Sequence, residues 1–229
     1  KFRNLLIEKQ KYKKLFKELN KQLESLGLSI SNAKGAIIDA TLIESAGRPN
    51  KYMDNPVEDR KEEEASNPDI SYGKDVDAKW IKKGKKSHYG YKVFASVDDE
   101  HGFIQTVHTE SAEAYEAHRL ETMLEDLNCE HLLADKAYDT VANRDLLKKK
   151  KVKNRILQKA VRNKPLTRRQ KRRNILISKT RYKVERCFGT LKRKFNFARA
   201  SYFSTIKVNA QALLKAMCFN ALKAVNLMA

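Results

Sequence analysis

Residues 89 to 109 constrain the fold most, because they predict a β-hairpin. Between Tyr89 and Val97, aromatic, aliphatic or small residues occupy every second position, which is the two-residue period of a strand. The acidic run at 98–102 ends in glycine and predicts a turn, and residues 103–109 predict the second strand. Strands and helices alternate after this hairpin, so the chain is predicted to form an α/β fold: a mixed sheet flanked by helices.

Periodicity assigns the other elements. Apolar residues recur at helical spacing over residues 2–28, which predicts one amphipathic helix. Residues 44–87 hold few apolar residues, three prolines and many charges, and predict a long loop or insertion after the first strand. Two units are expected: an N-terminal helix at 1–30, and the main domain at 33–229 with C-terminal basic helices. The remaining predicted elements are strands at 35–43, 131–134 and 155–158 and helices at 112–127, 141–150, from 166 onwards and at 206–227.

Positive charge is concentrated in one part of the chain. The 229 residues carry a formal net charge of +20, and residues 141–200 hold 23 Lys and Arg residues against Asp145 and Glu185 as the acidic residues. Such a block on a folded segment favours a polyanionic partner, DNA above all. A solvated, charged tail is the alternative, which the apolar residues recurring through the block disfavour.

Cysteine usage and hydropathy narrow the setting. Cys129, Cys187 and Cys218 show no zinc-ligand spacing and no disulfide framework. A reducing, cytosolic compartment therefore fits the chain best. No apolar run is long enough to span a bilayer, so no membrane partner is expected.

Three acidic residues stand out as candidate metal ligands. Asp39 follows the apolar run 36–38, Asp135 follows the apolar run 132–134, and Glu185 lies in a basic helix. If the two strands are parallel neighbours, both aspartates point into one crevice at the carboxyl end of the sheet. Carboxylate oxygens are the ligands that Mg²⁺ prefers, and a third carboxylate would complete a two-metal site.

Each carboxylate also has an ordinary structural explanation. Asp39 could cap a turn, Asp135 could cap a helix, and Glu185 could pair with Arg181 one helical turn earlier. The conjunction of the three favours the metal site. On a helix, Arg181 and Lys192 fall within about 60° of Glu185, so two cations would stand beside the third carboxylate to hold phosphates.

Four stretches carry a resemblance to a known family. They resemble the DDE transposases of the IS5 group of bacterial insertion sequences, within the wider IS4-like set. The order of the motifs matches as well, and the resemblance runs along the whole chain. The stretches are Ile38-Asp39-Ala40-Thr41-Leu42-Ile43, Lys86-Ser87-His88-Tyr89-Gly90-Tyr91-Lys92, Ala134-Asp135-Lys136-Ala137-Tyr138-Asp139 and Val184-Glu185-Arg186-Cys187-Phe188-Gly189-Thr190-Leu191-Lys192.

The resemblance implies a ribonuclease H-like catalytic core with Asp39, Asp135 and Glu185 as the catalytic, metal-binding triad. It implies Mg²⁺ or Mn²⁺ as the cofactor, two ions in all, with DNA cleavage and strand transfer as the activity. It also implies a homodimer on paired DNA ends, a nucleoid-associated place in the bacterial cytoplasm, and a front region of which residues 1–30 are the remnant. The family signature Y-x2-R-x3-E-x6-K fits Arg181, Glu185 and Lys192, whereas the tyrosine position is Ser178.

Further basic residues are predicted to contact DNA. The family motifs place His88, Lys92 and Lys136 near the site, and the run from Arg162 to Arg173 is expected to follow the phosphate backbone. Few aromatic residues are interleaved there, so phosphate contact is favoured over base stacking. The DNA-contacting residues predicted are Arg181, Lys192, His88, Lys92, Lys136, Arg168, Arg169, Arg172 and Arg173.

Alternative functions stay open at this point. A decayed or domesticated transposase would bind DNA without catalysis, although the intact Asp39, Asp135 and Glu185 argue against it. A plain nuclease of the same fold would cleave strands without joining them. Both differ from a transposase in what they do to a phosphodiester, which makes them separable by experiment.

Overall fold

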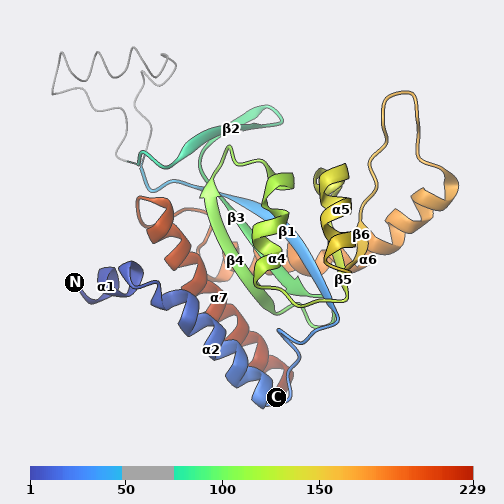
Figure 1. Ribbon diagram of the computed structural model, residues 1–229. Helices are drawn as coiled ribbons and strands as arrows, with labels where there is room; N and C mark the ends of the chain where they lie inside the picture. Colours follow the sequence, from blue (N-terminus) through green and yellow to red (C-terminus); the bar gives the residue numbers. More distant parts are fainter. Residues whose placement is uncertain (48–74, 229) are drawn as a thin grey trace, which may run out of the picture.

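The computed structural model of the protein describes residues 1–47 and 75–228 (Figure 1). Within these ranges a six-stranded sheet forms, in the order β2-β3-β1-β5-β6, with β4 paired to β3. The strands are β1 (Gly35–Glu44), β2 (Lys79–Lys83), β3 (Lys86–Asp98), β4 (Ile104–Ser111), β5 (His131–Ala134) and β6 (Lys153–Ile156). The helices are α1 (Phe2–Glu8), α2 (Lys11–Ser25), α4 (Leu120–Glu125), α5 (Val141–Lys149), α6 (Arg168–Lys194) and α7 (Thr205–Met228), with the short 3₁₀ helices η1 (Glu116–Arg119) and η2 (Lys136–Tyr138).

Strand β1 lies in the middle of the sheet and has a neighbour of each kind. It pairs antiparallel with β3 and parallel with β5. Its residues Ile37 and Ile38 point to opposite faces and are both fully buried, as expected of a strand covered on both sides. Gly90 in β3 permits the close approach to β1, because a Cβ atom there would lie 2.1 Å from the Ile43 carbonyl oxygen.

Helices cover both faces of the sheet, which confirms the predicted fold class. On one face α2, α6 and α7 pack over a core that includes Ile37, Val93 and Leu133. On the other face α4 and α5 pack over Ile38 and Phe94. Since side chains alternate along a strand, Asp39 shares its face with Ile37 and therefore looks toward α6.

The prediction of one continuous helix over residues 2–28 is wrong, because two helices form there. The chain forms α1 and α2, separated by a break at which Gln10 adopts a left-handed conformation (φ 49°). Helix α2 runs beside α7 (Figure 1), and its buried Asn20 donates to the Ile104 carbonyl at 3.1 Å. Asn220 of α7 donates to Asn20 at 2.8 Å, so α2 is tied into the core by a buried polar network.

Three other boundaries differ from the predictions. Residues 79–83 form β2 inside the stretch 44–87 that was predicted to be a loop, whose two ends also belong to β1 and β3. Residues 48–74 of that stretch lie outside the described residues. Residues 112–115 are not helical, and the helical part of the predicted helix at 112–127 begins with η1 at Glu116. Strand β6 begins two residues before the predicted start. The strand at 131–134 is confirmed in full, and in the described ranges no helix has the length and apolarity of a membrane span.

Candidate active site

The two predicted aspartates stand side by side. In the parallel pairing of β1 and β5, Ile38 is opposite Ala134, so Asp39 and Asp135 follow at neighbouring positions. Strand β5 ends there, whereas β1 continues to Glu44. Asp39 therefore lies within its strand rather than at its end, but at the point where β1 loses its β5 neighbour. Both carboxylates therefore lie at the carboxyl end of β5.

Arg181 bridges these carboxylates from α6. Its Nη2 donates to Asp39 Oδ2 at 2.8 Å, and its Nη1 lies 3.6 Å from Asp135 Oδ1. The side chain is buried, with 10% of its surface exposed, against 18% for Asp39 and 35% for Asp135. Ion pairs in such an environment are screened little by solvent. The guanidinium of Arg181 therefore contacts both carboxylates.

The environment of Asp39 works against its charge. Burial raises the pKa of this carboxyl above its ordinary value, and the nearby Glu116 and Asp135 carboxylates raise it further. The Arg181 guanidinium and the backbone N–H of Ala40, which donates at 2.9 Å, lower the pKa in part. A buried carboxylate with an excess of negative neighbours is stabilised by a bound cation.

Glu185 is not brought into contact with the two aspartates. It is exposed on α6 one turn after Arg181, and its side chain makes no hydrogen bond or ion pair with the described residues. Across residues 1–47 and 75–228, no group of three or more His, Cys, Asp or Glu side chains is arranged to hold a metal ion. At about 100° per residue, Glu185 still shares the helix side of Arg181. Its role as third ligand stays a prediction.

Two residues that sequence reasoning did not single out lie near the aspartates. Glu116 begins η1, and its charge acts on Asp39 more strongly than that of Asp135 does. Tyr138 is fully buried and its hydroxyl makes no hydrogen bond with the described residues. An unsatisfied buried hydroxyl costs roughly 1–3 kcal/mol. For Tyr138 its place in a matched family motif was an available signal, whereas nothing in the sequence pointed to Glu116.

The donor set fits a hard divalent cation. Asp39 and Asp135 offer carboxylate oxygens from neighbouring strand positions, and both already face one positive group, the Arg181 guanidinium. Mg²⁺ and Mn²⁺ take oxygen ligands of this kind and retain several waters. The unsatisfied Tyr138 hydroxyl beside these carboxylates is a further polar group that such a water could satisfy. Asp39 and Asp135 would hold the ion.

The structure separates the predicted DNA contacts into two groups. Three of them have partners within the protein: Arg181, whose contacts with Asp39 and Asp135 are described above, Lys92 and Arg173. Lys92 is buried and its Nζ lies 3.4 Å from Glu116 Oε1, so its ammonium faces a protein carboxylate, and its role as a DNA contact stays a prediction. Arg173 donates to the carbonyls of Ile156 and Asn154 at 3.0 and 2.8 Å. It ties α6 to β6.

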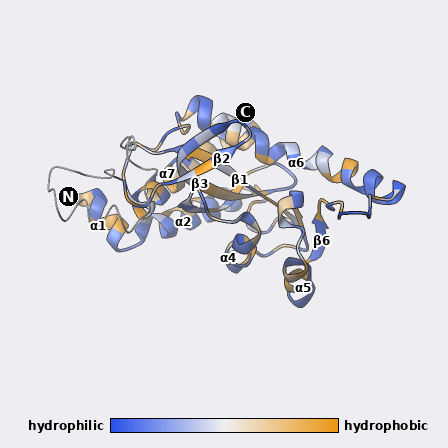
Figure 2. Ribbon diagram, turned by 90° about the horizontal axis from the view of Figure 1, so that it is seen from above, coloured by the Kyte–Doolittle hydropathy of each residue, from blue (hydrophilic) through white to orange (hydrophobic). Residues whose placement is uncertain are grey.

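The other predicted contacts stay accessible or partly so. Lys136 is exposed next to Asp135, and Lys192 is half-buried, donating to the Leu42 carbonyl at 2.9 Å. His88 lies in β3, with Nδ1 4.0 Å from Glu44 Oε1. Arg168, Arg169 and Arg172 are exposed on the first turns of α6, which extend beyond the sheet past β6 (Figures 1 and 2).

Comparison with known proteins defines the class. The family described as "Transposase DDE domain" matches residues 31–221. The transposase for insertion sequence element IS1106 of Neisseria meningitidis serogroup B is 42% identical over 226 residues, covering 98% of this chain and 77% of that protein. The piggyBac transposase, solved as a synaptic complex with hairpin DNA, is similar in fold, with a TM-score of 0.51 at 11% identity. The match covers 84% of this chain and 47% of the piggyBac chain.

The fold is ribonuclease H-like, and the family match defines a phosphoryl-transferring domain that acts on DNA. The chain belongs to the DDE transposase family, among the insertion-sequence transposases. The resemblance to the IS5 group is thereby confirmed. Members of this family bind DNA and generally use divalent metal ions. The division at residue 30 stays a prediction, as does the assignment of individual site residues.

Proposed function

We propose that the chain cleaves a phosphodiester at the ends of its insertion sequence and joins the freed strand to target DNA, with Asp39, Asp135 and Glu185 as metal ligands. The observation that carries the proposal is the parallel register that sets Asp39 and Asp135 at neighbouring positions. The similarity to a bacterial insertion-sequence transposase supports a reaction on DNA. We place this reaction in the bacterial cytoplasm and assign it to a homodimer on paired DNA ends.

The reaction consists of two in-line displacements at phosphorus. In the first, water attacks the phosphodiester at the element end, a P–O bond forms, and the 3′-oxygen leaves as a hydroxyl. In the second, this 3′-hydroxyl attacks a phosphodiester of the target, and the target's own 3′-oxygen leaves. A pair of Mg²⁺ or Mn²⁺ ions, when bound, supplies activation of the attacking oxygen and charge stabilisation of the leaving oxygen.

The chain's own residues position the DNA. Arg181 presents a guanidinium with donors in fixed geometry at the crevice, which suits a phosphate as well as a carboxylate. Lys192 lies on the same side of α6 and reaches the β1 backbone at Leu42. Lys136 is exposed beside Asp135. These cations are placed to hold the backbone while the carboxylates hold the ion, so catalysis rests on positioning and charge neutralisation.

The first test compares Mn²⁺ binding in the wild type and in Asp135→Asn by titration calorimetry with a short DNA duplex present. We expect binding in the wild type and its loss in the variant, together with loss of Mn²⁺-dependent plasmid nicking and retention of duplex binding. Asp145→Asn is the matched control, because Asp145 is exposed on α5, and it should behave as the wild type.

Other outcomes would identify the competing functions. Equal Mn²⁺ affinity in both proteins, or no binding in either, would contradict the proposal and favour a DNA-binding remnant. Nicking without joining of a pre-cut, labelled 3′-end to a plasmid would indicate a plain nuclease. Glu185→Gln, examined in the same assays, decides the third ligand: unchanged Mn²⁺ binding and nicking would remove Glu185 from the triad.

A further inference from the structure

A buried lysine fixes Glu116 in place. Lys92 lies in β3 and has 7% of its side chain exposed. Its Nζ donates to the Ala114 carbonyl at 2.7 Å and lies 3.4 Å from Glu116 Oε1. A buried ammonium requires such partners. The pair therefore holds the Glu116 side chain over the strand next to β1.

A second clamp holds η1 against η2. Asn143 of α5 is buried, and its Nδ2 donates to the carbonyls of Ala117 and Tyr138 at 3.0 and 2.9 Å. Ala117 follows Glu116 in η1, and Tyr138 ends η2, which starts directly after Asp135. Asn143 thus fixes the segment that carries Glu116 to the segment that carries Asp135.

The Tyr138 hydroxyl marks the space between these groups. Tyr138 is fully buried, and its hydroxyl makes no hydrogen bond within the described parts of the chain. Burial raises its pKa well above the ordinary value, and the carboxylates of Glu116, Asp39 and Asp135 raise it further, Glu116 most of the three. The hydroxyl is therefore a buried donor without an acceptor, on which the charges of these acidic groups act.

Glu116 retains capacity for another partner. Its side chain is 28% exposed. Apart from Lys92, it makes no hydrogen bond or ion pair with residues 1–47 or 75–228. A glutamate needed only to neutralise Lys92 has no reason to stand next to Asp39, where its charge opposes that of the aspartate. A divalent ion with its waters is a partner that would turn this repulsion into attraction.

We propose that Glu116, held by Lys92, is a positioning residue of the active site that accepts hydrogen bonds from the water shell of the divalent ion at Asp39 and Asp135. This inference rests on the proposed function. It adds to the site a residue of η1 that is not one of the three predicted metal ligands. The Tyr138 hydroxyl lies beside the same water shell and finds its acceptor there. Carboxylates in the outer shell of a metal orient the ligands and waters that bind it directly.

The test is Mn²⁺ affinity, measured by titration calorimetry in Glu116→Gln and Glu116→Asp. Loss of an outer-shell partner weakens metal binding by about 10- to 100-fold, so we expect at least about tenfold weaker binding in both variants. Glu121→Gln on α4 is the matched control, since Glu121 is exposed, and should bind Mn²⁺ as the wild type does. Thermal melting in the absence of metal verifies that each variant is folded.

Two outcomes would overturn the inference. Wild-type affinity in Glu116→Gln would leave Glu116 as a structural partner of Lys92. If Glu116→Gln binds Mn²⁺ weakly and Glu116→Asp binds it as the wild type does, only the charge of Glu116 matters for metal affinity. Aspartate keeps that charge, but its shorter side chain moves the carboxylate oxygens away from the water shell. If Glu116→Gln does not fold, the double variant Lys92→Met/Glu116→Leu replaces the pair with apolar groups, and wild-type affinity there would have the same consequence.

Failure of this inference differs from failure of the proposed function. If the wild type binds Mn²⁺, Asp135→Asn does not, and Glu116→Gln binds as the wild type does, only the inference about Glu116 is rejected. Absence of Mn²⁺ binding in the wild type itself rejects both. The three proteins are therefore measured side by side under one set of conditions.

Discussion

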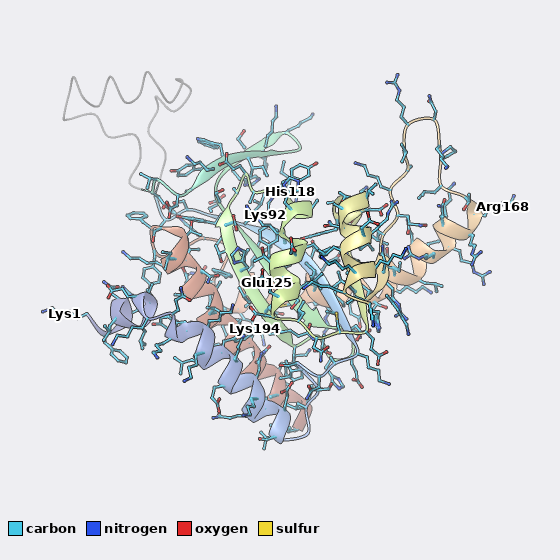
Figure 3. All side chains as sticks on the ribbon, viewed as in Figure 1. Lys1, Lys92, His118, Glu125, Arg168 and Lys194 are labelled. Atoms are coloured by element: carbon cyan, nitrogen blue, oxygen red, sulfur yellow. The ribbon has the colours of Figure 1, made fainter. Side chains whose placement is uncertain are left out.

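The two ends of α6 carry similar charge in opposite settings. In the C-terminal two thirds, residues 177–194, Arg181 is buried with Val184 and Leu191 and pairs with Asp39. In the N-terminal third, residues 168–176, Arg168 and Arg172 are exposed, and in Figure 3 Arg168 marks the end of the helix far from the sheet. The C-terminal part belongs to the candidate site, and the N-terminal part forms a basic arm.

The difference shows that burial, rather than the number of positive charges, decides what each arginine does. A charge in water is screened over about 8–10 Å at physiological salt and contributes little to stability, so the arm is free to act on a partner. Arg181 is desolvated and has its geometry fixed by two carboxylates. The arm is also properly folded, because Thr167 and Gln170 form a capping box at its start. This contradicts the alternative of a disordered charged tail.

The largest effect is expected from Arg181→Met. The variant removes the cation between Asp39 and Asp135, so plasmid nicking should fall by about a hundredfold or more, as for loss of a preorganised donor at a reacting centre. Duplex binding should persist, with the salt slope reduced by about one unit if Arg181 contacts a phosphate. Nicking of supercoiled plasmid and fluorescence anisotropy at several salt concentrations measure the two quantities.

Arg186→Met provides the comparison within the same helix. Arg186 is exposed, with its guanidinium carbon 5.9 Å from the centre of the Tyr182 ring, and it does not touch the aspartates. It should nick at the wild-type rate. If Arg181→Met also nicks at the wild-type rate, Arg181 has a structural role only. The buried and exposed parts of α6 would then not differ in their contribution to catalysis.

A smaller, purely electrostatic effect is expected from the arm. The triple variant Arg168→Ala/Arg169→Ala/Arg172→Ala should weaken binding to any duplex and make the slope of log K against log salt less negative by up to about 2.7, at about 0.9 per phosphate contact. Anisotropy titrations at several salt concentrations measure this slope. The melting temperature should stay near the wild-type value, since the three side chains are exposed.

The control removes the same charge elsewhere. Lys11, Lys14 and Lys21 are exposed on α2, so their triple alanine variant changes net charge equally without touching α6. A salt slope that shifts alike in both triple variants would mean that DNA responds to overall charge, and the arm would lose its assigned role as a DNA contact.

Local pattern predicted those parts of the fold whose signals are local. The apolar runs before Asp39 and Asp135 gave β1 and β5, because buried strands are continuous in hydrophobicity. Strand β2 was missed, since an exposed strand of lysines around Trp80 has no apolar alternation and forms only by pairing with β3. The break at Gln10 was missed because one residue's left-handed conformation leaves no periodic trace.

The candidate site was predictable in its two aspartates but not in the contacts that surround them. Asp39 and Asp135 each follow an apolar run, and the sequence predicted that they would lie close together if their strands were parallel neighbours. The sequence predicted that Arg181 contacts phosphate, whereas in the structure it contacts both aspartates. These contacts depend on how α6 crosses β1, which is set by tertiary packing. Glu116 approaches Asp39 only because the hairpin β3–β4 delivers η1 to that place.

The smallest expected effect concerns the stability of the fold, and it tests whether the buried charge of Asp39 destabilises the protein when no metal is bound. Burial raises the pKa of Asp39 in the folded state above 3.8 despite Arg181. Between 3.8 and that raised value the folded state binds more protons than the unfolded state, so stability falls as pH rises through this window. Asp39→Asn lacks this loss and should raise the melting temperature at pH 7 by a few degrees in metal-free buffer, the gain disappearing as pH falls toward 3.8.

Asp126→Asn serves as the control of opposite sign. Burial raises the pKa of Asp126, but its hydrogen bonds from Lys13 and Lys17 outweigh burial and leave the pKa below its ordinary value. Its stabilisation is present above pH 3.8 and is lost as pH falls through the lowered pKa, so this variant should melt lower at pH 7. A lower melting temperature for Asp39→Asn as well would mean that the Arg181 pair stabilises the fold, and that α6 is held to the sheet by the same charges that we assign to metal binding.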